Sequence, residues 1–441
     1  MKRCVTMNSS VNVIGAGFAG CEAAWQIAKR GIKVNLFDMK PKKFSPAHKS
    51  KDLCELVCSN SFKADKVDSA SGLLKQEMRI LGSLVLECAD KCRVPAGGAL
   101  AVDREKFSAM VTEKIKNNSL INFISDEVDE IPSDGITIIA TGPLTSEALS
   151  EKIKNICGSS LSFFDAAAPI VTFESIDMNN AFFASRYGKG DGSDYLNCPL
   201  NKEEYEIFYN ELINAERAPL HDVDTNDIRV YEGCMPVEVM AKRGFDTLRY
   251  GPMKPVGLRN PNSDEKPFAV VQLRKETSAG TLYNMVGFQT NLKFPEQRRV
   301  FGLIPALKNL DIVRYGVMHR NMFIDSPRLL NSDYSMRNNK NLFFAGQITG
   351  VEGYIESACS GLMAGINAVK RFNSKDTISL PSTTIIGALS NYISDESVNN
   401  FQPMGANFGI INPLKEVIKD KKLRYNEFAK RSIEYLESIE V

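Results

Sequence analysis

The first hydrophobic segment of the chain, Val11 to Ile14, leads through a glycine-rich turn into a stretch with apolar residues at helical spacing. One face of this helix is formed by Ala19, Ala23, Ala24, Ile27 and Ala28. Gly31 is placed to stop the helix, and residues 34–37 resume a buried strand. The pattern predicts a strand, turn, helix and second strand at the start of a parallel sheet.

Later segments extend the same pattern. Residues 100–118 are amphipathic and predict a helix with Asp103 as its cap, and residues 120–131 predict short strands. Residues 136–141 (ITIIAT) predict a buried strand that breaks at Gly142. Near the C-terminus, residues 341–345 (NLFFA) predict another buried strand, followed by a glycine-punctuated segment that is helical toward its end. Apolar strands that end at glycine indicate a parallel sheet with its ligand beyond the strand ends.

The middle of the chain has a different texture, with short strand-like segments at 269–273 and 282–290, many prolines, and a polar, glycine-rich run at 188–194. We therefore predict an α/β protein with an inserted smaller α+β domain. The predicted division is 1–162 for the first part of a nucleotide-binding domain, 163–324 for the insertion, and 325–441 for its second part.

The turn after the first strand carries the strongest chemical signal. Gly15, Gly17 and Gly20 have G-x-G-x-x-G spacing, and Asp38 ends the next strand. Glycines permit a tight turn, a close approach to a pyrophosphate and close packing of helix on strand. With Ala16, Phe18 and Ala19 they form the predicted cofactor turn. An acidic residue at position 38 favours the unphosphorylated ribose of FAD or NAD over NADP.

Composition narrows the class of protein further. The chain has 441 residues, 43% of them hydrophobic, and a formal charge of +1 from 54 basic and 53 acidic residues. No global field indicates a nucleic-acid partner, so an RNA-binding surface must be local. The sequence has no signal peptide and no membrane-spanning run, and its ten cysteines suit a reducing cytoplasm. Two C-x3-C pairs lack accompanying histidines, so we predict no metal.

Two cysteines and one histidine are candidates for chemistry. Cys234 precedes Pro236, which suits the first position of a helix ending at Gly244, and a helix N-terminus favours a reactive thiolate. From the residues alone, a buried and unreactive Cys234 is as compatible with the sequence as a reactive one. Cys58 lies in a loop placed to overhang the cofactor, with a structural role as the alternative. His319 has basic neighbours and is compatible with an ordinary surface ring.

Long, unusual segments occur in collinear order between about residues 11 and 413: VIGAGFAGCEAAW, ELVCSNS, VPAGGALAVDRE, IIATGPLTSEAL, EGCMPVEVMAKRG, AVVQLR, VGFQTNLKF, RYGVMHRN, FFAGQITGVEGYIESACSGLMAGINA and FQPMGANFG. Together they resemble the folate- and FAD-dependent tRNA (uracil-5-)-methyltransferases. The resemblance implies a Rossmann-like FAD-binding domain of the glutathione-reductase-like, GidA-related type. The chain departs from the common pattern at Asn291.

The resemblance also implies an activity. It is the transfer of a one-carbon unit from 5,10-methylenetetrahydrofolate to a uridine in the T loop of tRNA, with FAD reduced by NAD(P)H. Cys234 becomes the candidate nucleophile, and Cys58 a proton acceptor at C5 or a second redox-active thiol. Implied flavin contacts come from Thr141, Gly142, Gly346, Gln347, Gly353 and Tyr354. The folate is expected to stack near His319 or Tyr354, and no obligate protein partner is implied.

Other functions stay open at this point. A related flavin- and folate-dependent enzyme acting on ribosomal RNA uses the same fold. A GidA-like wobble-uridine modification protein has a similar FFAGQ segment but is normally longer. A general NAD(P)H-dependent flavin oxidoreductase would need a closely spaced pair of redox cysteines, and this sequence has no C-x-x-C or C-x4-C pair. A non-catalytic FAD-binding RNA chaperone is a fourth class.

Overall fold

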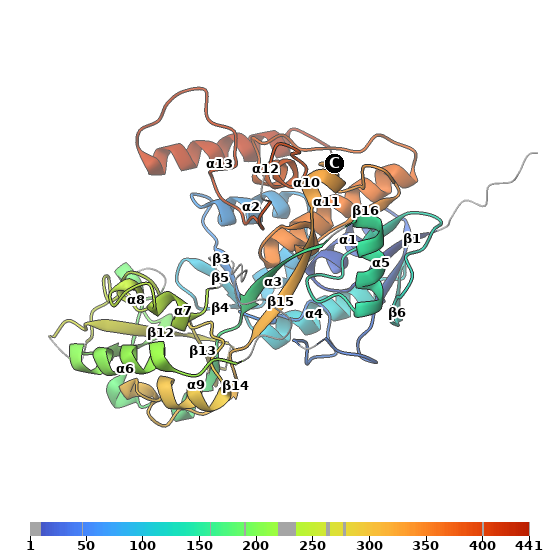
Figure 1. Ribbon diagram of the computed structural model, residues 1–441. Helices are drawn as coiled ribbons and strands as arrows, with labels where there is room; N and C mark the ends of the chain where they lie inside the picture. The colour runs from blue at the N-terminus through green and yellow to red at the C-terminus, as the bar shows by residue number, and fades with distance from the viewer. Residues whose placement is uncertain are drawn as a thin grey trace, which may run out of the picture.

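In a computed structural model, the described residues are 10–45, 47–158, 160–188, 191–218, 235–261, 265–276, 279–398 and 401–440. A five-stranded parallel sheet of order β16-β7-β1-β2-β6 forms the centre of the larger body (Figure 1). Its strands are β1 (Ser10–Ile14), β2 (Lys33–Asp38), β6 (Ile121–Ser125), β7 (Thr137–Ile139) and β16 (Leu342–Phe344). The predicted buried strands therefore pair in one sheet.

Helices pack on this sheet and on one another. They are α1 (Phe18–Lys29), α2 (Ala70–Ile80), α3 (Leu84–Lys91), α4 (Arg104–Lys116), α5 (Glu147–Cys157), α10 (Ser326–Leu329), α11 (Tyr354–Phe372), α12 (Ile385–Tyr392) and α13 (Lys421–Glu437). Asp103 caps α4 as predicted, by accepting from the amide of Lys106 at 3.2 Å. Residues 100–102, however, belong to strand β5 and not to the helix.

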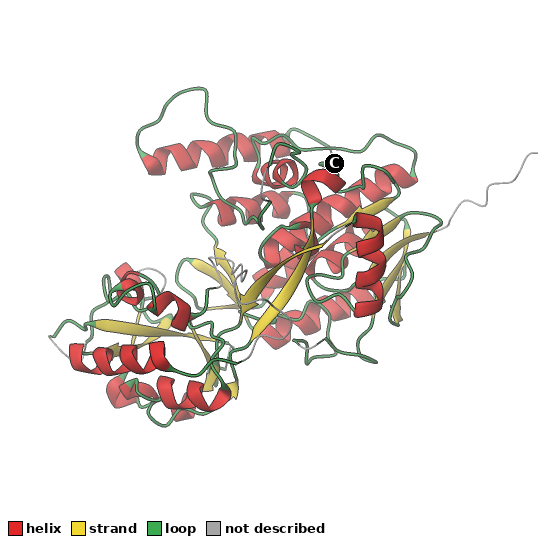
Figure 2. Cartoon of the chain, viewed as in Figure 1, coloured by secondary structure: helices red, strands yellow, loops and turns green. Residues whose placement is uncertain are grey.

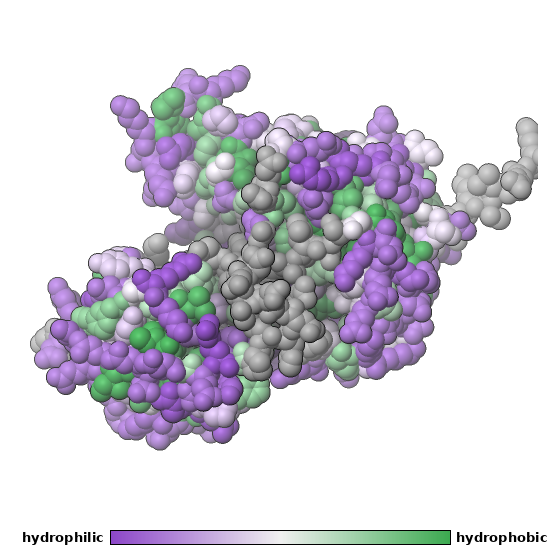
Figure 3. Space-filling model, viewed as in Figure 1, coloured by the Kyte–Doolittle hydropathy of each residue, from purple (hydrophilic) through white to green (hydrophobic). Residues whose placement is uncertain are grey.

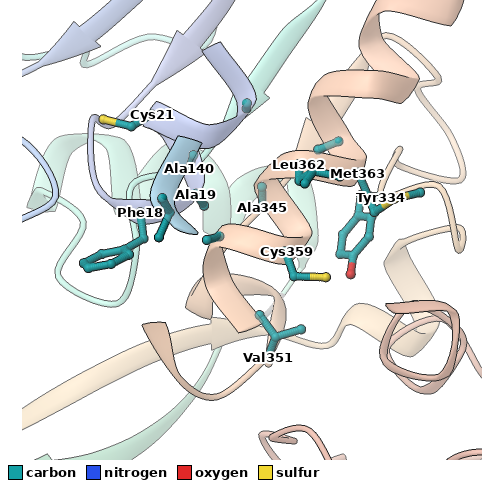
Figure 4. Packing of buried hydrophobic residues seen from close by; sticks show 14 of the residues in the cluster. Phe18, Ala19, Cys21, Ala140, Tyr334, Ala345, Val351, Cys359, Leu362 and Met363 are labelled. Atoms are coloured by element: carbon teal, nitrogen blue, oxygen red, sulfur yellow. The ribbon is translucent and has the colours of Figure 1, made fainter. Parts of the chain in front are cut away.

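The close approach of α1 and α11 is made possible by glycine. A β-carbon on Gly361 would lie 2.1 Å from the carbonyl oxygen of Ala19, and one on Gly365 would lie 2.8 Å from that of Ala23. Figure 4 shows Ala19 of α1 next to the part of α11 that carries Cys359 and Leu362. This contact fixes the start of α1, where the cofactor turn lies, against the C-terminal half of the chain.

A small antiparallel sheet of order β3-β5-β4 lies beside this core, with β3 (Ser61–Ala64), β4 (Arg93–Val94) and β5 (Ala99–Val102). Strand β5 pairs with β4, which directly precedes it in the chain, and with β3, from which it is separated by α2 and α3. Residues 99–102 are therefore held extended by tertiary pairing, although their pattern also suits a helix.

Two strands connect the larger body to the rest of the chain. β8 (Ser160–Ala166) and β15 (Met318–Ile324) form an antiparallel ladder that crosses the centre of Figure 1. We call residues 167–317, between them, the inserted segment. The predicted boundaries at residues 163 and 324 both fall within this ladder and stay predictions.

The inserted segment has a hydrophobic core of its own. Its six-stranded sheet has the order β10-β11-β12-β13-β9-β14. The strands are β9 (Ile170–Thr172), β10 (Phe182–Ala184), β11 (Tyr195–Leu200), β12 (Ala269–Lys275), β13 (Leu282–Met285) and β14 (Ile312–Arg314). The helices are α6 (Lys202–Asn214), α7 (Val237–Ala241), α8 (Thr247–Tyr250) and α9 (Phe294–Phe301), seen at the lower left of Figure 2.

Candidate active site

A pocket lies at the carboxyl ends of β1, β2 and β7 and encloses about 1410 Å³, its open mouth included. The predicted site residues that line it are Gly15, Ala16, Gly17, Phe18, Ala19, Asp38, Cys58, Thr141, Gly142, Gly346, Gln347 and Tyr354. The fold thus gathers segments from both halves of the chain at the edge of the sheet where parallel α/β proteins bind ligands.

The glycine turn is built by close backbone contacts. Gly15 has φ of +99°, and a β-carbon there would lie 2.5 Å from the carbonyl oxygen of Ala140. A β-carbon on Gly20 would lie 1.7 Å from the carbonyl oxygen of Gly15, so Gly20 serves the packing of α1 on β1. Gly20 does not line the pocket. At Gly17 a β-carbon would meet no heavy atom within 4 Å, which leaves space for a ligand beside the backbone.

The start of α1 fits the diphosphate of a dinucleotide. Gly17 is the N-cap residue, no side chain caps the helix, and the first turn has no acidic residue. The uncapped amides of Phe18 and Ala19 therefore remain available to an anion at the positive end of the helix dipole. The half-buried Asp38 carboxylate accepts from the amide of Ala16 at 2.8 Å and from that of Lys40 at 2.9 Å. Asp38 thus fixes the turn from the end of β2.

The segment after β16 also lines the pocket. Gly346 has φ of +87°, and its amide donates to Ser360 Oγ at 2.6 Å. Gln347 donates to Glu352 Oε2 at 2.7 Å. Gly353, with φ of +126°, is the N-cap of α11 but does not line the pocket. Its lack of a side chain accommodates Glu356, whose Oε2 would lie 2.1 Å from a β-carbon.

Cys58 meets Tyr354 in the pocket lining. The phenol oxygen of Tyr354 accepts from the amides of Val57 and Cys58, both at 2.8 Å, and lies 3.0 Å from Cys58 Sγ. Since the two amides occupy the oxygen lone pairs, the phenol hydrogen is directed to the sulfur. Burial raises the pKa of the Tyr354 phenol well above its ordinary value, so the phenol keeps this hydrogen at neutral pH. Its ring packs against Phe18, with centroids 4.7 Å apart.

The loop that carries Cys58 is also held by charged side chains. Arg104, at the start of α4, donates to the carbonyl oxygen of Leu56 and, at 2.9 Å, to Glu276 Oε2 of the inserted segment. Although burial opposes the charged form of Arg104, Glu276 holds its pKa above the ordinary value. Arg274 donates to Asn60 Oδ1 at 2.9 Å and to Ser59 Oγ at 2.8 Å. Residues 56–60 are therefore fastened to the inserted segment.

Sequence reasoning did not identify Arg104, Glu276 and Asn60 as site residues. Arg274 is buried and bonded to residues 59 and 60, so it is not available to a surface that binds phosphate. The only sequence signal was that Arg104 and Arg274 lie at the ends of two family-like segments, VPAGGALAVDRE and AVVQLR.

Two predicted residues are described only in part or not at all. Cys234 lies outside the described residues, which resume at Met235. The helix predicted after Pro236 is present as α7, but it ends at Ala241 and has only five residues. The backbone of His319 lies in β15, two residues before Asn321, which lines the pocket.

Three further cysteines, Cys54, Cys88 and Cys92, have structural surroundings. Cys54 is buried, and burial raises its pKa well above the ordinary value, so it stays a thiol. Cys88 lies in α3 and Cys92 is its C-cap residue. Among the described residues, His, Cys, Asp and Glu form no group of three or more suited to a metal ion. In the same part of the chain, no helix has the length and apolar character needed to cross a bilayer.

The fold and the site define a dinucleotide-binding α/β protein with a thiol at its cofactor pocket. Residues 10–376 match the family model of glucose inhibited division protein A. The chain is 63% identical over 427 residues to a protein of Acetivibrio thermocellus named methylenetetrahydrofolate–tRNA-(uracil-5-)-methyltransferase TrmFO, covering 97% of each chain. A protein of the same name from Brevibacillus brevis is 54% identical, with 97% of this chain and 98% of the other covered. The chain belongs to this methyltransferase family within the wider GidA group.

The structural comparison agrees on the fold. GidA of Aquifex aeolicus superposes with a TM-score of 0.71 at 17% identity, covering 98% of this chain and 74% of the other. The Rossmann-like, GidA-related fold that the sequence predicts is confirmed. The GidA chain is the longer of the two, and its identity is far below that of the methyltransferases.

Proposed function

We propose that this protein methylates C5 of a uridine in the T loop of tRNA, with 5,10-methylenetetrahydrofolate as carbon donor, FAD as bound cofactor and NAD(P)H as reductant. The names of the relatives at 63% and 54% identity state the folate donor, the tRNA and the uracil C5 position. The observation that carries the proposal is the single pocket, which joins the uncapped start of α1 to the Cys58–Tyr354 pair.

The chain would hold FAD through its backbone. The amides of Phe18 and Ala19 bind the diphosphate, the free lone pairs of Asp38 accept from the ribose hydroxyls, and Gly17 leaves room for the close approach. Thr141, Gly142, Gly346 and Gln347 line the same pocket and would hold the remainder of the cofactor. Bound FAD, once reduced, supplies the electrons that convert a transferred methylene into a methyl group.

We assign the thiols complementary roles. Uracil C5 is a poor nucleophile until a group adds at C6, and a thiolate there produces an enolate that attacks an electrophilic methylene. Cys234 is our candidate for the addition at C6. Cys58 is our candidate for accepting the C5 proton, because the Tyr354 hydroxyl directs its hydrogen to Cys58 Sγ and so favours the thiolate. The alternative role of Cys58 as a redox-active thiol would not require this hydrogen bond.

The folate ring needs a flat partner beside the flavin. The ring of Tyr354 packs against Phe18 on one side, and its hydroxyl is hydrogen-bonded to the Cys58 loop. We therefore favour His319, two residues from the pocket-lining Asn321, as the stacking residue. A tRNA substrate, a folate pool and the abundance of unpaired cysteines favour the cytoplasm as the site of action.

The test is direct. Purified protein should be yellow with a flavin spectrum, and labelled methylenetetrahydrofolate should transfer label to unmodified tRNA transcripts but not to ribosomal RNA. Cys234→Ala should abolish transfer while retaining the flavin. Label in ribosomal RNA alone would replace the tRNA proposal with its nearest rival. A colourless preparation that FAD does not reconstitute would overturn the function altogether.

A further inference from the structure

Tyr187 combines exposure with an unfavourable backbone conformation. Its side chain is 63% exposed, and its φ of 56° and ψ of 27° lie in the left-handed region. An aromatic residue rarely adopts this conformation, and such outliers cluster at functional sites. Because the ring is exposed, packing in the core does not explain why the chain keeps a left-handed backbone conformation at this residue.

The ring is held in place by a second loop. The amide of Tyr187 donates to the carbonyl oxygen of Gly257 at 2.9 Å. The ring lies over Gly257, where a β-carbon would be 2.7 Å from ring atom Cζ. Arg186 fastens the same two loops by donating to the carbonyl oxygen of Val256 at 2.8 Å and to Gln272 Oε1 at 2.9 Å. The result is a fixed ring on a glycine floor with its surface open to solvent.

Strand β12 links this ring to the thiol end of the pocket. Gln272 is bonded to Arg186, and Arg274, two residues along the same strand, is bonded to Ser59 and Asn60 beside Cys58. Alternate residues of a strand lie on one face, about 7 Å apart. The Tyr187 loop and the Cys58 loop are therefore anchored to neighbouring positions of one strand.

The loop beneath Tyr187 is basic. Between positions 242 and 259 the cationic residues are Lys242, Arg243, Arg249, Lys254 and Arg259, and the acidic residue is Asp246. Asp246 is paired with Arg249. On the other loop Asp194 accepts from Ser185 Oγ, which leaves Asp191 as an exposed acid. The excess of cationic over acidic residues between positions 242 and 259 stands out in a chain whose formal charge is only +1.

The cations that precede and follow Gly257 in the sequence favour an anionic partner. On the face drawn in Figure 3, hydrophilic side chains predominate over the inserted segment, and hydrophobic ones occur in small separate groups. A base with its phosphates matches an exposed aromatic ring flanked by cations. Tyr250, the last residue of α8, is 83% exposed and adds a second aromatic side chain to the 242–259 segment.

We propose that Tyr187 is a stacking platform for an unpaired base of the RNA substrate, next to the uridine that enters the pocket, with Lys254 and Arg259 contacting the flanking phosphates. This inference rests on the proposed function. A uridine must leave its stack before its C5 and C6 atoms can be reached, and a stacking partner for a displaced neighbour lowers the cost of that step. The platform would act on RNA binding and not on the chemical step.

The test compares Tyr187→Ala with Tyr187→Phe, using an unmodified tRNA transcript that carries 2-aminopurine beside the target uridine. Losing one stacking ring should weaken the affinity about 5- to 150-fold. Tyr187→Phe keeps the ring and should bind nearly as wild type. The 2-aminopurine fluorescence should be quenched on binding to wild type and to Tyr187→Phe, but not to Tyr187→Ala. Lys254→Gln should lower the salt dependence of binding by about one released counterion.

Phe294→Ala is the matched control, since Phe294 is an aromatic residue of the inserted segment that is 51% exposed on a different helix, α9. It should leave RNA affinity unchanged. If Tyr187→Ala bound the tRNA transcript as tightly as wild type and the protein methylated that transcript, the stacking platform would be overturned and the proposed function would remain supported. Binding only to a ribosomal RNA fragment, lost in Tyr187→Ala, would support the platform and overturn the tRNA substrate. Wild type that binds neither RNA would overturn both.

Discussion

The two ends of the pocket are constructed in different ways. At the dinucleotide end, one short segment from Gly15 to Ala19 presents backbone amides, and the necessary geometry comes from glycines and from one carboxylate, Asp38. At the thiol end, the loop of Cys58 is held by side chains from α4, α11 and β12. A backbone-built site is damaged by added atoms, whereas a side-chain-built site is damaged by removed ones.

The largest effect should come from removing a charge at the thiol end. Arg104→Ala leaves the buried Glu276 carboxylate without its cation, and breaking a buried ion pair costs about 3–5 kcal/mol. The free energy of unfolding in urea should fall by this amount. Lys308→Ala is the control, because it breaks a more exposed pair with Asp177 and should leave the free energy of unfolding nearly unchanged. An equal loss in the free energy of unfolding for the two variants would mean that the ion pair of Arg104 with Glu276 does not hold the Cys58 loop.

An added methyl group should do most harm where α1 packs on β1. In Gly20→Ala the new carbon would lie 1.7 Å from the carbonyl oxygen of Gly15. Overpacking of this kind costs about 1–3 kcal/mol and would displace the cofactor turn. The protein should unfold at lower urea concentration and purify with less flavin, measured as the ratio of flavin to protein absorbance. Full flavin content in this variant would contradict a backbone-built site.

Removing one hydroxyl should affect the thiol end more gently. Tyr354→Phe deprives the amides of Val57 and Cys58 of their acceptor, at a net cost of about 1 kcal/mol. Alkylation of Cys58 by iodoacetamide at pH 7, followed by peptide mass spectrometry, should slow because the sulfur loses its donor. Tyr392→Phe removes a hydroxyl that donates to Gln402 instead and should alter neither quantity at Cys58. Unchanged alkylation in Tyr354→Phe would count against Cys58 as a base.

The smallest change in stability should come from Gly17→Ala. A β-carbon at position 17 meets no protein atom within 4 Å, so the free energy of unfolding without cofactor should change by no more than about 0.5 kcal/mol. The methyl group would nonetheless occupy space that the diphosphate needs. Reconstitution with FAD, followed by fluorescence titration, should show weaker binding. Unaltered FAD affinity would place the diphosphate elsewhere in the pocket.

The same contrast explains what the sequence could predict. The dinucleotide end was predictable because its strand, glycines, helix and carboxylate follow one another within residues 11–38. The thiol end was not, because Arg104 meets Glu276 across 172 residues and Arg274 meets Ser59 across 215. Residues 100–102 were predicted as helix for a related reason, since their strand depends in part on pairing with β3, which lies before α2 and α3 in the chain.

The parallel sheet has a consequence for how the protein is synthesised. Strand β7 lies between β1 and β16, yet β16 follows it about 200 residues later, after the whole inserted segment. At roughly 5–20 residues per second, a ribosome needs about 10–40 s to cover that distance. During that interval β7 is an open sheet edge, and α1 lacks the helix that packs against it. The hydrogen-bonding groups on the outer edge of β7 therefore stay open to other strands until residues 342–344 have been made.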